Sequence, residues 1–362
     1  MTIIRYIFLS LALCGFGWSA YGQDNTPKYS NEFLALGVGA RAFGMGSIGA
    51  STADDVTAGY WNPAGLMRMQ PDYQGMFMHS SYFGGIASYD YAAVAASVLD
   101  SSKIALSVIR FAVDDIPDTR FLFDANGAID YNRIRFFSAS DYAFLLSYAQ
   151  GTRFLGGLNM GGSVKIIHRQ VGDFARAWGF GVDLGAQKRW RSWQFGVSAR
   201  DIFGTFNAWN HNPDELREIY NATNNDVPLN TLEITLPRLV LAASREFVFL
   251  DHFSVLTSIE LQATFDGKRN TVIKSDFASI DPIIGTEIGY KDLLFLRFGA
   301  GQFQKVTELS GEGDWKYLPS GGLGFKIREL AIDYALTDVG DQAEGLYSHV
   351  FSIKVDFHAK DD

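Results

Sequence analysis

The stretch Tyr347-Ser-His-Val-Phe-Ser-Ile-Lys-Val-Asp-Phe357 decides the fold, because nearly every second side chain along it is large and apolar. In an extended strand, successive side chains point to opposite faces. One face of this stretch carries Tyr347, His349, Phe351, Ile353, Val355 and Phe357, and the other carries Ser348, Val350, Ser352, Lys354 and Asp356. A helix would scatter the apolar side chains around its axis and bury none of them. The alternation therefore predicts a strand between an apolar and a polar environment, as in a transmembrane β-barrel.

The same alternation recurs along the chain in segments of about ten residues. These segments predict strands at 73–83, 86–99, 102–112, 140–150, 155–170, 177–189, 192–204, 232–245, 251–263, 282–290, 293–303, 319–328, 329–337 and 346–357. Bacterial single-chain barrels have an even number of antiparallel strands. We therefore predict an all-β fold, a transmembrane antiparallel β-barrel of about fourteen strands over 72–357.

The connections between these strands alternate in length. Short ones fall at 100–101, 151–154, 190–191, 246–250, 291–292 and 328–329, and long ones at 113–139, 205–231, 264–281 and 304–318. Outer-membrane barrels have short periplasmic turns and longer outer loops. A soluble β-sandwich is the alternative, but nothing in that fold alternates its loops in this way. The pattern predicts an outer-membrane location with both termini in the periplasm, where 358–362 would form a short tail.

The composition excludes several classes of protein. Hydrophobic residues make up 47% of the 362 residues, so the chain can bury a full core. The formal net charge is −9, which excludes nucleic acid as a partner because a phosphate-binding surface needs an excess of basic residues. Charged strand residues are expected to face the lumen, since a charge on the lipid face costs about 2–4 kcal/mol near the bilayer midplane. The residues in question are Arg110, Lys165, Arg169, Asp183, Lys188, Glu260, Lys326, Asp333, Lys354 and Asp356.

The first 22 residues have the features of a signal peptide. A short basic start ending at Arg5 precedes an apolar run that is too short to span a bilayer, and small residues at Ala20 and Gly22 suit a signal peptidase. A membrane anchor is the alternative, and the length of the run argues against it. Cys14 is the only cysteine, so cleavage leaves a mature chain without disulfides, thiolate zinc sites or a cysteine nucleophile.

Residues 23–71 do not alternate like a strand, and glycine and alanine are dense in them. Such a segment can pack closely inside a lumen, where irregular backbone is surrounded by protein. We therefore predict an N-terminal hatch. The run Gly44-Met-Gly-Ser-Ile-Gly49 formally matches a dinucleotide fingerprint, but no βαβ unit surrounds it, so we expect no cofactor.

Three runs carry a family resemblance: Leu36-Gly-Val-Gly-Ala-Arg-Ala-Phe-Gly-Met-Gly-Ser47, Ala53-Asp-Asp55 and Tyr60-Trp-Asn-Pro-Ala-Gly-Leu66. Together they resemble the N-terminus of the PorV/PorQ family of outer-membrane proteins. That family is similar to the FadL-type barrels, which have fourteen strands and a hatch with an Asn-Pro-Ala motif. The resemblance implies that the hatch motif residues are Arg41, Gly44, Gly46, Asp54, Asp55, Asn62, Pro63 and Ala64.

The resemblance also implies a function. PorV/PorQ-like proteins are accessories of the type IX secretion system of Bacteroidota, so we expect a barrel that docks a translocon barrel or a cargo protein with a C-terminal signal. The candidate docking residues of the long loops are Phe121, Phe123, Phe136, Phe137, Trp209, Leu216 and Tyr220. The alternative is a FadL-like channel for uptake of hydrophobic small molecules, with a hydrophobic ligand in the lumen and membrane lipid around the barrel.

The two longest loops carry further signals. Asn212-Pro213 predicts a helix N-terminus, because asparagine caps helices and proline suits the first turn. In 113–139, Asp114, Asp115, Asp118, Asp124 and Asp130 are compatible with a calcium site or with a solvated acidic loop, and the missing distal glutamate favours the second. The six histidines lie apart and no nucleophile motif occurs, so we predict neither a metal site nor an enzyme.

Overall fold

A computed structural model describes residues 30–99, 101–124, 126–222, 225–226, 230–250, 252–307, 313–337 and 347–359. The signal peptide expected at 1–22, the first residues of the expected hatch (23–29) and the end of the expected tail (360–362) lie outside this part of the chain. Within the described residues, no helix is both long enough and apolar enough to cross a membrane.

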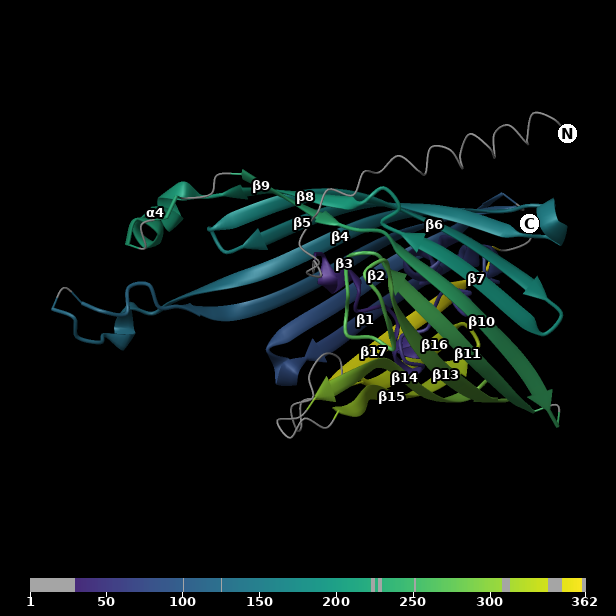
Figure 1. Cartoon of the computed structure of the whole chain (residues 1–362). Helices are drawn as coiled ribbons and strands as arrows, with labels where there is room; N and C mark the ends of the chain where they lie inside the picture. Colours follow the sequence, from purple (N-terminus) through teal and green to yellow (C-terminus); the bar gives the residue numbers. More distant parts are fainter. Residues whose placement is uncertain are drawn as a thin grey trace, which may run out of the picture.

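The strands form one antiparallel sheet, which closes because the first strand pairs with the last, Tyr73 opposite Phe357 (Figure 1). The strands are β1 Tyr73–Tyr82, β2 Ala87–Leu99, β3 Ser102–Asp118, β4 Arg135–Gly151, β5 Asn159–Val171, β6 Ala175–Trp190, β7 Trp193–Arg200, β8 Thr205–His211, β9 Asn230–Thr235, β10 Arg238–Phe249, β11 Phe253–Thr264, β12 Ile273–Lys274, β13 Ser279–Tyr290, β14 Leu294–Thr307, β15 Gly313–Ile327, β16 Leu330–Thr337 and β17 Ser348–Phe357.

Two strands of the wall are broken, so these segments make a closed barrel of fourteen strands. β6 pairs with β7 along one half and with β8 along the other, so β7 and β8 are one strand interrupted at 201–204. β9 and β10 are likewise one strand, because β9 pairs with β8 and β10 with β7. β12 is a two-residue strand beside β13. The predicted fold class and strand number are confirmed.

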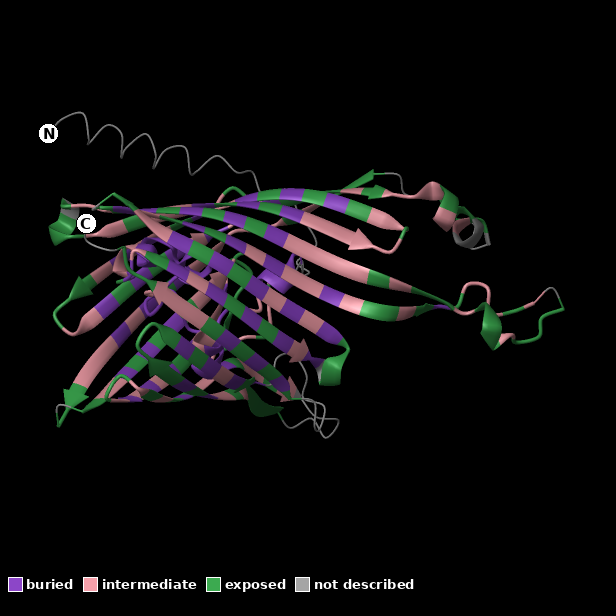
Figure 2. Cartoon of the chain, turned by 180° about the vertical axis from the view of Figure 1, so that it is seen from behind, coloured by how far each residue is buried: buried purple, intermediate pink, exposed green. Residues whose placement is uncertain are grey.

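Burial alternates along the strands as the sequence predicts, which Figure 2 shows as stripes across the wall. In β17, His349, Phe351 and Ile353 are exposed on the outside, while Ser348 and Ser352 are buried on the inside. A surface of this kind is stable only when an apolar medium covers it, because the hydrophobic effect penalises so much apolar area in water.

A row of polar and aromatic side chains crosses the outside of six neighbouring strands. Its members pair across β1 to β6 and are His79, Asp90, Arg110, Tyr142, His168 and Trp178. Arg110 Nη1 donates to Asp90 Oδ2 at 3.1 Å, and Asp90 Oδ1 lies 2.7 Å from His79 Nδ1. Girdles of this composition occur where a barrel wall meets the membrane–water interface.

The inward direction expected for Arg110 and Lys188 is wrong. Arg110 belongs to the girdle, where a charge on the outer face costs only about 0–1 kcal/mol. Lys188 follows the inward-facing Gln187, and its ammonium reaches the backbone carbonyl groups of Leu155 and Gly156 at the short-turn end. Both side chains are tolerated outside because each reaches polar partners at the edge of the apolar band.

The strands run further than expected at the long-loop end. β3 and β4 pair as far as Asp118 opposite Arg135, and β8 and β9 occupy both ends of the stretch 205–231. Beyond the girdle a strand no longer needs an apolar outer face, so the alternation that revealed the strands fades although the pairing continues. β5, by contrast, begins at Asn159 and not at 155, because the 3-10 turn η5 Phe154–Gly156 precedes it.

Connections of two lengths lie at opposite ends of the barrel. Short turns follow β2, β4, β6, β10, β13 and β15, and the chain also ends there, after Phe357 (Figure 1). The β3–β4 hairpin and the helix α4 Pro213–Ala222 project from the other end. α4 is capped as the sequence predicts, since the Asn212 Oδ1 atom accepts from the Asp214 backbone N–H at 3.2 Å.

Residues 30–71, here called the N-terminal segment, lie inside the barrel. Their elements are η1 Glu32–Leu34, α2 Ala40–Gly44, α3 Ala58–Trp61 and η2 Pro63–Arg68. Val38, Phe43 and Tyr60 of this segment are buried with Met78 and Tyr89 of the wall in one apolar cluster. Burial of side chains of this size contributes about 1.5–3 kcal/mol each, so apolar packing holds much of the segment in place.

Candidate functional site

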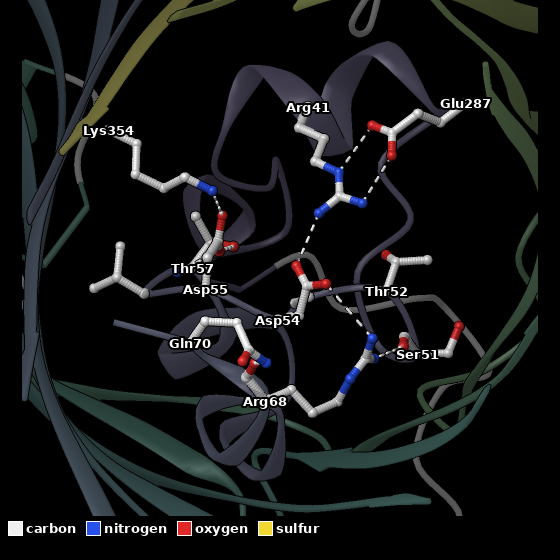
Figure 3. A network of polar contacts seen from close by, with 12 residues as sticks. Arg41, Ser51, Thr52, Asp54, Asp55, Thr57, Arg68, Gln70, Glu287 and Lys354 are labelled. Carbon is white, nitrogen blue, oxygen red and sulfur yellow. Dashed lines mark hydrogen bonds and ion pairs between the residues drawn. The ribbon is translucent and has the colours of Figure 1, made fainter. Parts of the chain in front are cut away.

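The centre of the site is a guanidinium group that joins the N-terminal segment to the wall (Figure 3). Arg41 of α2 donates from Nε and Nη2 to the two carboxylate oxygens of Glu287, at 2.9 and 2.8 Å. Its Nη1 atom donates to Asp54 Oδ1 at 2.9 Å. A two-pronged contact of this kind fixes orientation as well as distance. Burial lowers the pKa of Arg41, but Glu287 and Asp54 raise it more, so the pKa lies well above its ordinary value.

The charges continue from Glu287 across two further strands. Arg297 of β14 donates to Glu287 at 2.5 Å and to Asp333 of β16 at 2.6 Å. At the other end, Arg68 of η2 lies 3.5 Å from Asp54 and donates to the Ser51 carbonyl at 2.9 Å (Figure 3). This ion-pair chain runs Arg68, Asp54, Arg41, Glu287, Arg297, Asp333 and thereby connects two parts of the segment to three wall strands.

A second ion pair fastens the segment to the last strand. Lys354 Nζ of β17 lies 2.7 Å from Asp55 Oδ2, and the Thr57 hydroxyl donates to Asp55 Oδ1 at 2.5 Å (Figure 3). Burial raises the pKa of Asp55, but the Lys354 ammonium and the hydrogen bonds from Lys354 and Thr57 lower it more. The pKa of Asp55 is therefore well below its ordinary value, and this carboxyl is ionised at neutral pH.

The Asn-Pro-Ala motif attaches the segment to the opposite side of the wall. The Asn62 side chain is completely buried, and its Nδ2 atom lies 2.8 to 3.2 Å from the carbonyl oxygens of Ala50, Ala186 and Val197. Ala186 and Val197 are cross-strand partners on β6 and β7. Pro63 opens η2 and Ala64 N donates to Asn62 Oδ1 at 3.3 Å, so the motif turns the chain and satisfies the amide together.

Three glycines allow the segment to approach the wall closely. Gly46 has a φ of +80°, a conformation that side chains disfavour, and a Cβ there would lie 3.1 Å from the Ala300 backbone nitrogen. A Cβ on Gly185 of β6 would lie 2.0 Å from Asn62 Oδ1. Gly44 lies equally close to the wall, since a Cβ there would be 3.1 Å from Gly322 Cα.

The structure therefore brings all eight hatch-motif residues into the lumen, and it adds residues that the sequence did not single out. Glu287, Arg297 and Arg68 complete the ion-pair chain. Glu260, which the sequence predicts to face the lumen, accepts from the backbone N–H groups of Gly49 and Ala50 at 3.2 and 3.0 Å. Glu287 and Arg297 occupy inward positions of β13 and β14, and the alternation along these strands was the signal that could have identified them.

Two cavities lie on either side of this fastened segment. The first, of about 440 Å³, is lined by Glu32, Leu36 and Ser47 of the segment and by wall residues at the long-loop end of β10, β11, β13 and β14. We call it the mouth cavity. The second, of about 190 Å³, is lined by Arg41, Asp54 and wall residues such as Asp356 toward the short-turn end.

The predicted docking residues lie in different places. Phe121 and Phe123 are in the connection after β3, and Phe123 is 59% exposed. The sequence placed Phe136, Phe137 and Trp209 in loops, but they lie on strands β4 and β8. Leu216 and Tyr220 are on α4, and both are half-buried. The cause of this difference is the extension of the strands beyond the girdle.

The aspartates of the predicted acidic loop serve local contacts. Asp124 accepts from the backbone N–H groups of Asn126 and Ala128, and Asp118 pairs with Arg120, whose Nη2 also reaches Glu215 of α4 at 3.2 Å. Nowhere in the described part of the chain do three or more carboxylate, histidine or cysteine groups gather in a way that could hold a metal ion.

The fold is similar to that of solved hydrocarbon channels. The CymD monoaromatic hydrocarbon channel is 16% identical with a TM-score of 0.56, and the match covers 90% of this chain and 98% of that one. The Ralstonia pickettii toluene transporter TbuX is 14% identical with a TM-score of 0.53 over 89% and 99% of the two chains. The P. putida toluene transporter TodX is 15% identical with a TM-score of 0.51 over 90% and 99%.

These likenesses confirm the barrel architecture. No protein-family model matches the chain, and no curated protein does. The resemblance to the PorV/PorQ family, with its association with the type IX secretion system, has no support among the comparisons.

Proposed function

We propose that this chain is an outer-membrane channel that admits hydrophobic small molecules, and that the N-terminal segment is its gate. One observation carries the proposal: cavities of about 440 and 190 Å³ lie toward opposite ends of one lumen, with the fastened segment between them. Movement of the segment would join the two cavities into one path through the barrel. The channel is not an enzyme, and it needs no cofactor.

The outer surface supports the membrane location. The exposed apolar side chains of the wall match a lipid-covered band, and the girdle from His79 to Trp178 suits the edge of that band. Because the long connections lie at the girdle end, we place that end outside the cell and both termini in the periplasm. Membrane lipid is then a constant partner of the barrel.

The fastening suits a gate better than a permanent seal. Arg41 and Asp54 are 27% and 35% exposed, so water reaches their ion pair, which is correspondingly weak. Ion pairs and hydrogen bonds can break and reform without unfolding the wall, whose strands are hydrogen-bonded to one another in a closed sheet. The hydrophobic nature of the solute is supported by the likeness to channels named for monoaromatic hydrocarbons and toluene.

A reversible lock tests the gate. The Ala40 backbone N–H donates to Ser352 Oγ at 3.3 Å, so cysteines at Ala40 and Ser352 would join the segment to β17, and the mature chain has no other thiol. Uptake of radiolabelled toluene is measured in cells that lack the native chain and express either the wild type or the double variant. We expect uptake with the wild type, a loss in the oxidised variant and recovery on reduction.

Each result of that experiment has a definite meaning. Equal toluene uptake with and without the wild-type chain overturns the channel. Uptake by the wild type that the oxidised lock leaves unchanged overturns the gate but not the channel. Either single-cysteine variant is the matched control, because it carries one of the substitutions and cannot form the bridge.

A second candidate function is the secretion accessory that the resemblance implies. The observation in its favour is that Arg120 ties the connection after β3 to α4, forming a projecting unit with exposed Phe123 and Phe136. Exposed aromatic side chains on a braced projection are suited to binding a protein. This unit would dock a translocon barrel or a C-terminal-signal cargo.

Replacement of residues 212–229 by a short linker tests this second candidate. A deletion of 205–231 would also remove β8 and part of β9, which belong to the wall. Affinity purification of the tagged chain from outer membranes should yield a stoichiometric secretion protein with the wild type and none with the variant. Purification of the wild type without such a protein counts against an accessory role.

A further inference from the structure

The mouth cavity lies where two wall strands separate. β13 and β14 pair only from Tyr290 opposite Leu294 as far as Ile284 opposite Ala300. Beyond that point β13 continues to Ser279 and β14 to Thr307, and β14 is irregular between Gly301 and Gln304, with a φ of +52° at Gln302. Residues from both separated ends line the cavity, so backbone and side-chain polar groups of the wall face it.

Two charged lining residues, Arg269 and Glu32, already contact each other. Arg269 contacts Asp266 and lies 3.6 Å from Glu32 of the N-terminal segment. The Arg269 guanidinium is therefore already engaged by two carboxylates. The remaining charged lining residues are Arg238 and Asp281.

The positive charge of Arg238 has no direct partner. No hydrogen bond or ion pair joins its guanidinium to any residue in the described part of the chain. Its charged neighbours include two more cations, Arg200 and Arg269, together with Glu32 and Asp201. Arginine presents five N–H donors, so an unpaired guanidinium in a half-buried cavity calls for an anionic partner.

Asp281 carries the opposite charge on the same cavity. The Phe303 backbone N–H hydrogen-bonds to its carboxyl, but its Oδ1 atom is buried without any partner in the described structure. A buried acceptor that lacks a donor destabilises the fold, and more so when it is charged. The cavity thus presents one unpaired group of each sign.

The register of the strands sets the spacing between these two groups. Arg238 is opposite Thr264 of β11, which is opposite Ser279 of β13, and Asp281 is two residues further along β13. Two strand spacings of ~4.8 Å and two residues of ~3.4 Å each put the two Cα atoms ~12 Å apart. The Leu36 and Ile283 side chains also line the cavity and add apolar surface to it.

We propose that the mouth cavity binds a zwitterionic small molecule with an apolar spacer, its carboxylate on Arg238 and its ammonium on Asp281. This inference rests on the proposed function, because it names the kind of solute that pauses at the outer mouth of the channel. The ligand pairs both orphaned charges, and a chain of several methylene groups spans the distance between them. A neutral hydrocarbon would leave both charges unpaired.

Isothermal titration calorimetry of the full barrel in detergent at pH 7.5 tests the site. The probes are 6-aminohexanoate, which has both charges, hexanoate and hexylamine, which have one each, and toluene, which has none. We expect 6-aminohexanoate to bind at least about tenfold more tightly than the single-charge probes, because it makes one more charge-assisted contact than either of them. Arg238→Gln and Asp281→Asn should each remove that advantage.

Arg189→Gln is the matched control, since Arg189 is 62% exposed near the short turns, away from the cavity, and its loss should leave binding unchanged. Equal binding of hexanoate and 6-aminohexanoate, or no binding of either, overturns the inference. If 6-aminohexanoate does not bind but cells still take up toluene through the chain, the inference fails and the channel stands. If it binds and toluene uptake is absent, the site stands and the hydrocarbon channel fails.

Discussion

At the scale of single residues, Glu287 is the member of the ion-pair chain whose substitution should destabilise the protein most. It receives two hydrogen bonds from Arg41 and one from Arg297, and it is nearly buried. Removing one partner of a buried ion pair leaves the other charge without compensation, which costs more than the pair contributed. The two ends of the same contact are therefore not equivalent.

Substitution at these two ends should show the difference. Glu287→Gln removes the carboxylate that two guanidinium groups share and leaves each with one carboxylate, Asp54 or Asp333, so we expect it to lower the free energy of unfolding by about 3–5 kcal/mol. Arg41→Gln leaves Glu287 still paired with Arg297, so we expect a loss of about 1.5–3 kcal/mol. Urea unfolding of the refolded barrel measures both, and equal losses would contradict this account.

The Asp55–Lys354 contact should make stability depend on pH. The pKa of Asp55 is lowered in the folded state, so the folded protein binds fewer protons than the unfolded chain. The contribution of the Asp55–Lys354 contact to stability is present above the unfolded pKa of about 4. It is lost as the pH falls through the lower pKa of the folded state. The urea midpoint should fall between pH 5 and pH 2, and Asp55→Asn should flatten that fall. An unchanged slope would assign the fall to other carboxyl groups.

Asn62 is expected to tolerate no replacement. Asn62→Ala leaves the carbonyl oxygens of Ala50, Ala186 and Val197 without their common donor, at a cost of about 2–3 kcal/mol. Asn62→Asp should cost more, because it turns a carboxylate toward the same oxygens. Asn132→Ala, at an exposed turn, is the control and should lie within about 0.5 kcal/mol of the wild type.

At the scale of elements, the contact between the N-terminal segment and the wall depends on glycines, which have no side chain. β6 passes the Asn-Pro-Ala turn so closely that a Cβ on Gly185 would meet Asn62 Oδ1 at 2.0 Å and Pro63 Cδ at 3.0 Å. Gly75, on the outside of β1, has no atom within 4 Å of such a Cβ. The inner face of the wall is shaped to the segment, whereas the outer face has room for added methyl groups.

Substitution of each glycine by alanine should have different effects on the inner and the outer face of the wall. Gly185→Ala is expected to push η2 off the wall, so that a protease cleaves the N-terminal segment of the refolded barrel faster than in the wild type. Gly75→Ala should leave cleavage unchanged and stability within about 0.5 kcal/mol. Equal protease resistance of the two variants would show that the segment can yield without leaving the wall.

At the scale of the whole molecule, a rigid wall encloses a segment that is held by contacts of two kinds. Apolar packing around Phe43 and Tyr60 holds it on one side, and the ion-pair chain from Arg68 to Asp333 holds it on the other. Salt screens the second kind and strengthens the first. A change at the charged side can therefore open the lumen while the packed side stays in place.

Conductance in planar bilayers should report such an opening. Arg41→Ala breaks the ion pair with Glu287, the only one that α2 makes with the wall in the described structure, so we expect larger or more frequent openings than in the wild type. Arg217→Ala, on the exposed face of α4, is the control and should leave conductance unchanged. An Arg41→Ala barrel that conducts like the wild type would assign the closure to apolar packing alone.

Alternation with a period of two was enough to predict the barrel, its fourteen strands and the inward direction of Lys165, Glu260 and Lys354. This works because a bilayer imposes one local rule on every wall residue. Where the bilayer ends the rule ends too, so β3, β4, β8 and β9 were expected to stop before they do, and Arg110 was assigned to the wrong face.

The partners of the charges could not be read in the same way. Arg41 and Glu287 are 246 positions apart, and their contact depends on how the closed wall is staggered and on where the segment folds back inside it. The separation of β13 from β14 likewise arises from a ladder that ends at Ala300, although both strands continue. Local sequence determines which way a side chain points, and only closure of the barrel determines what it meets.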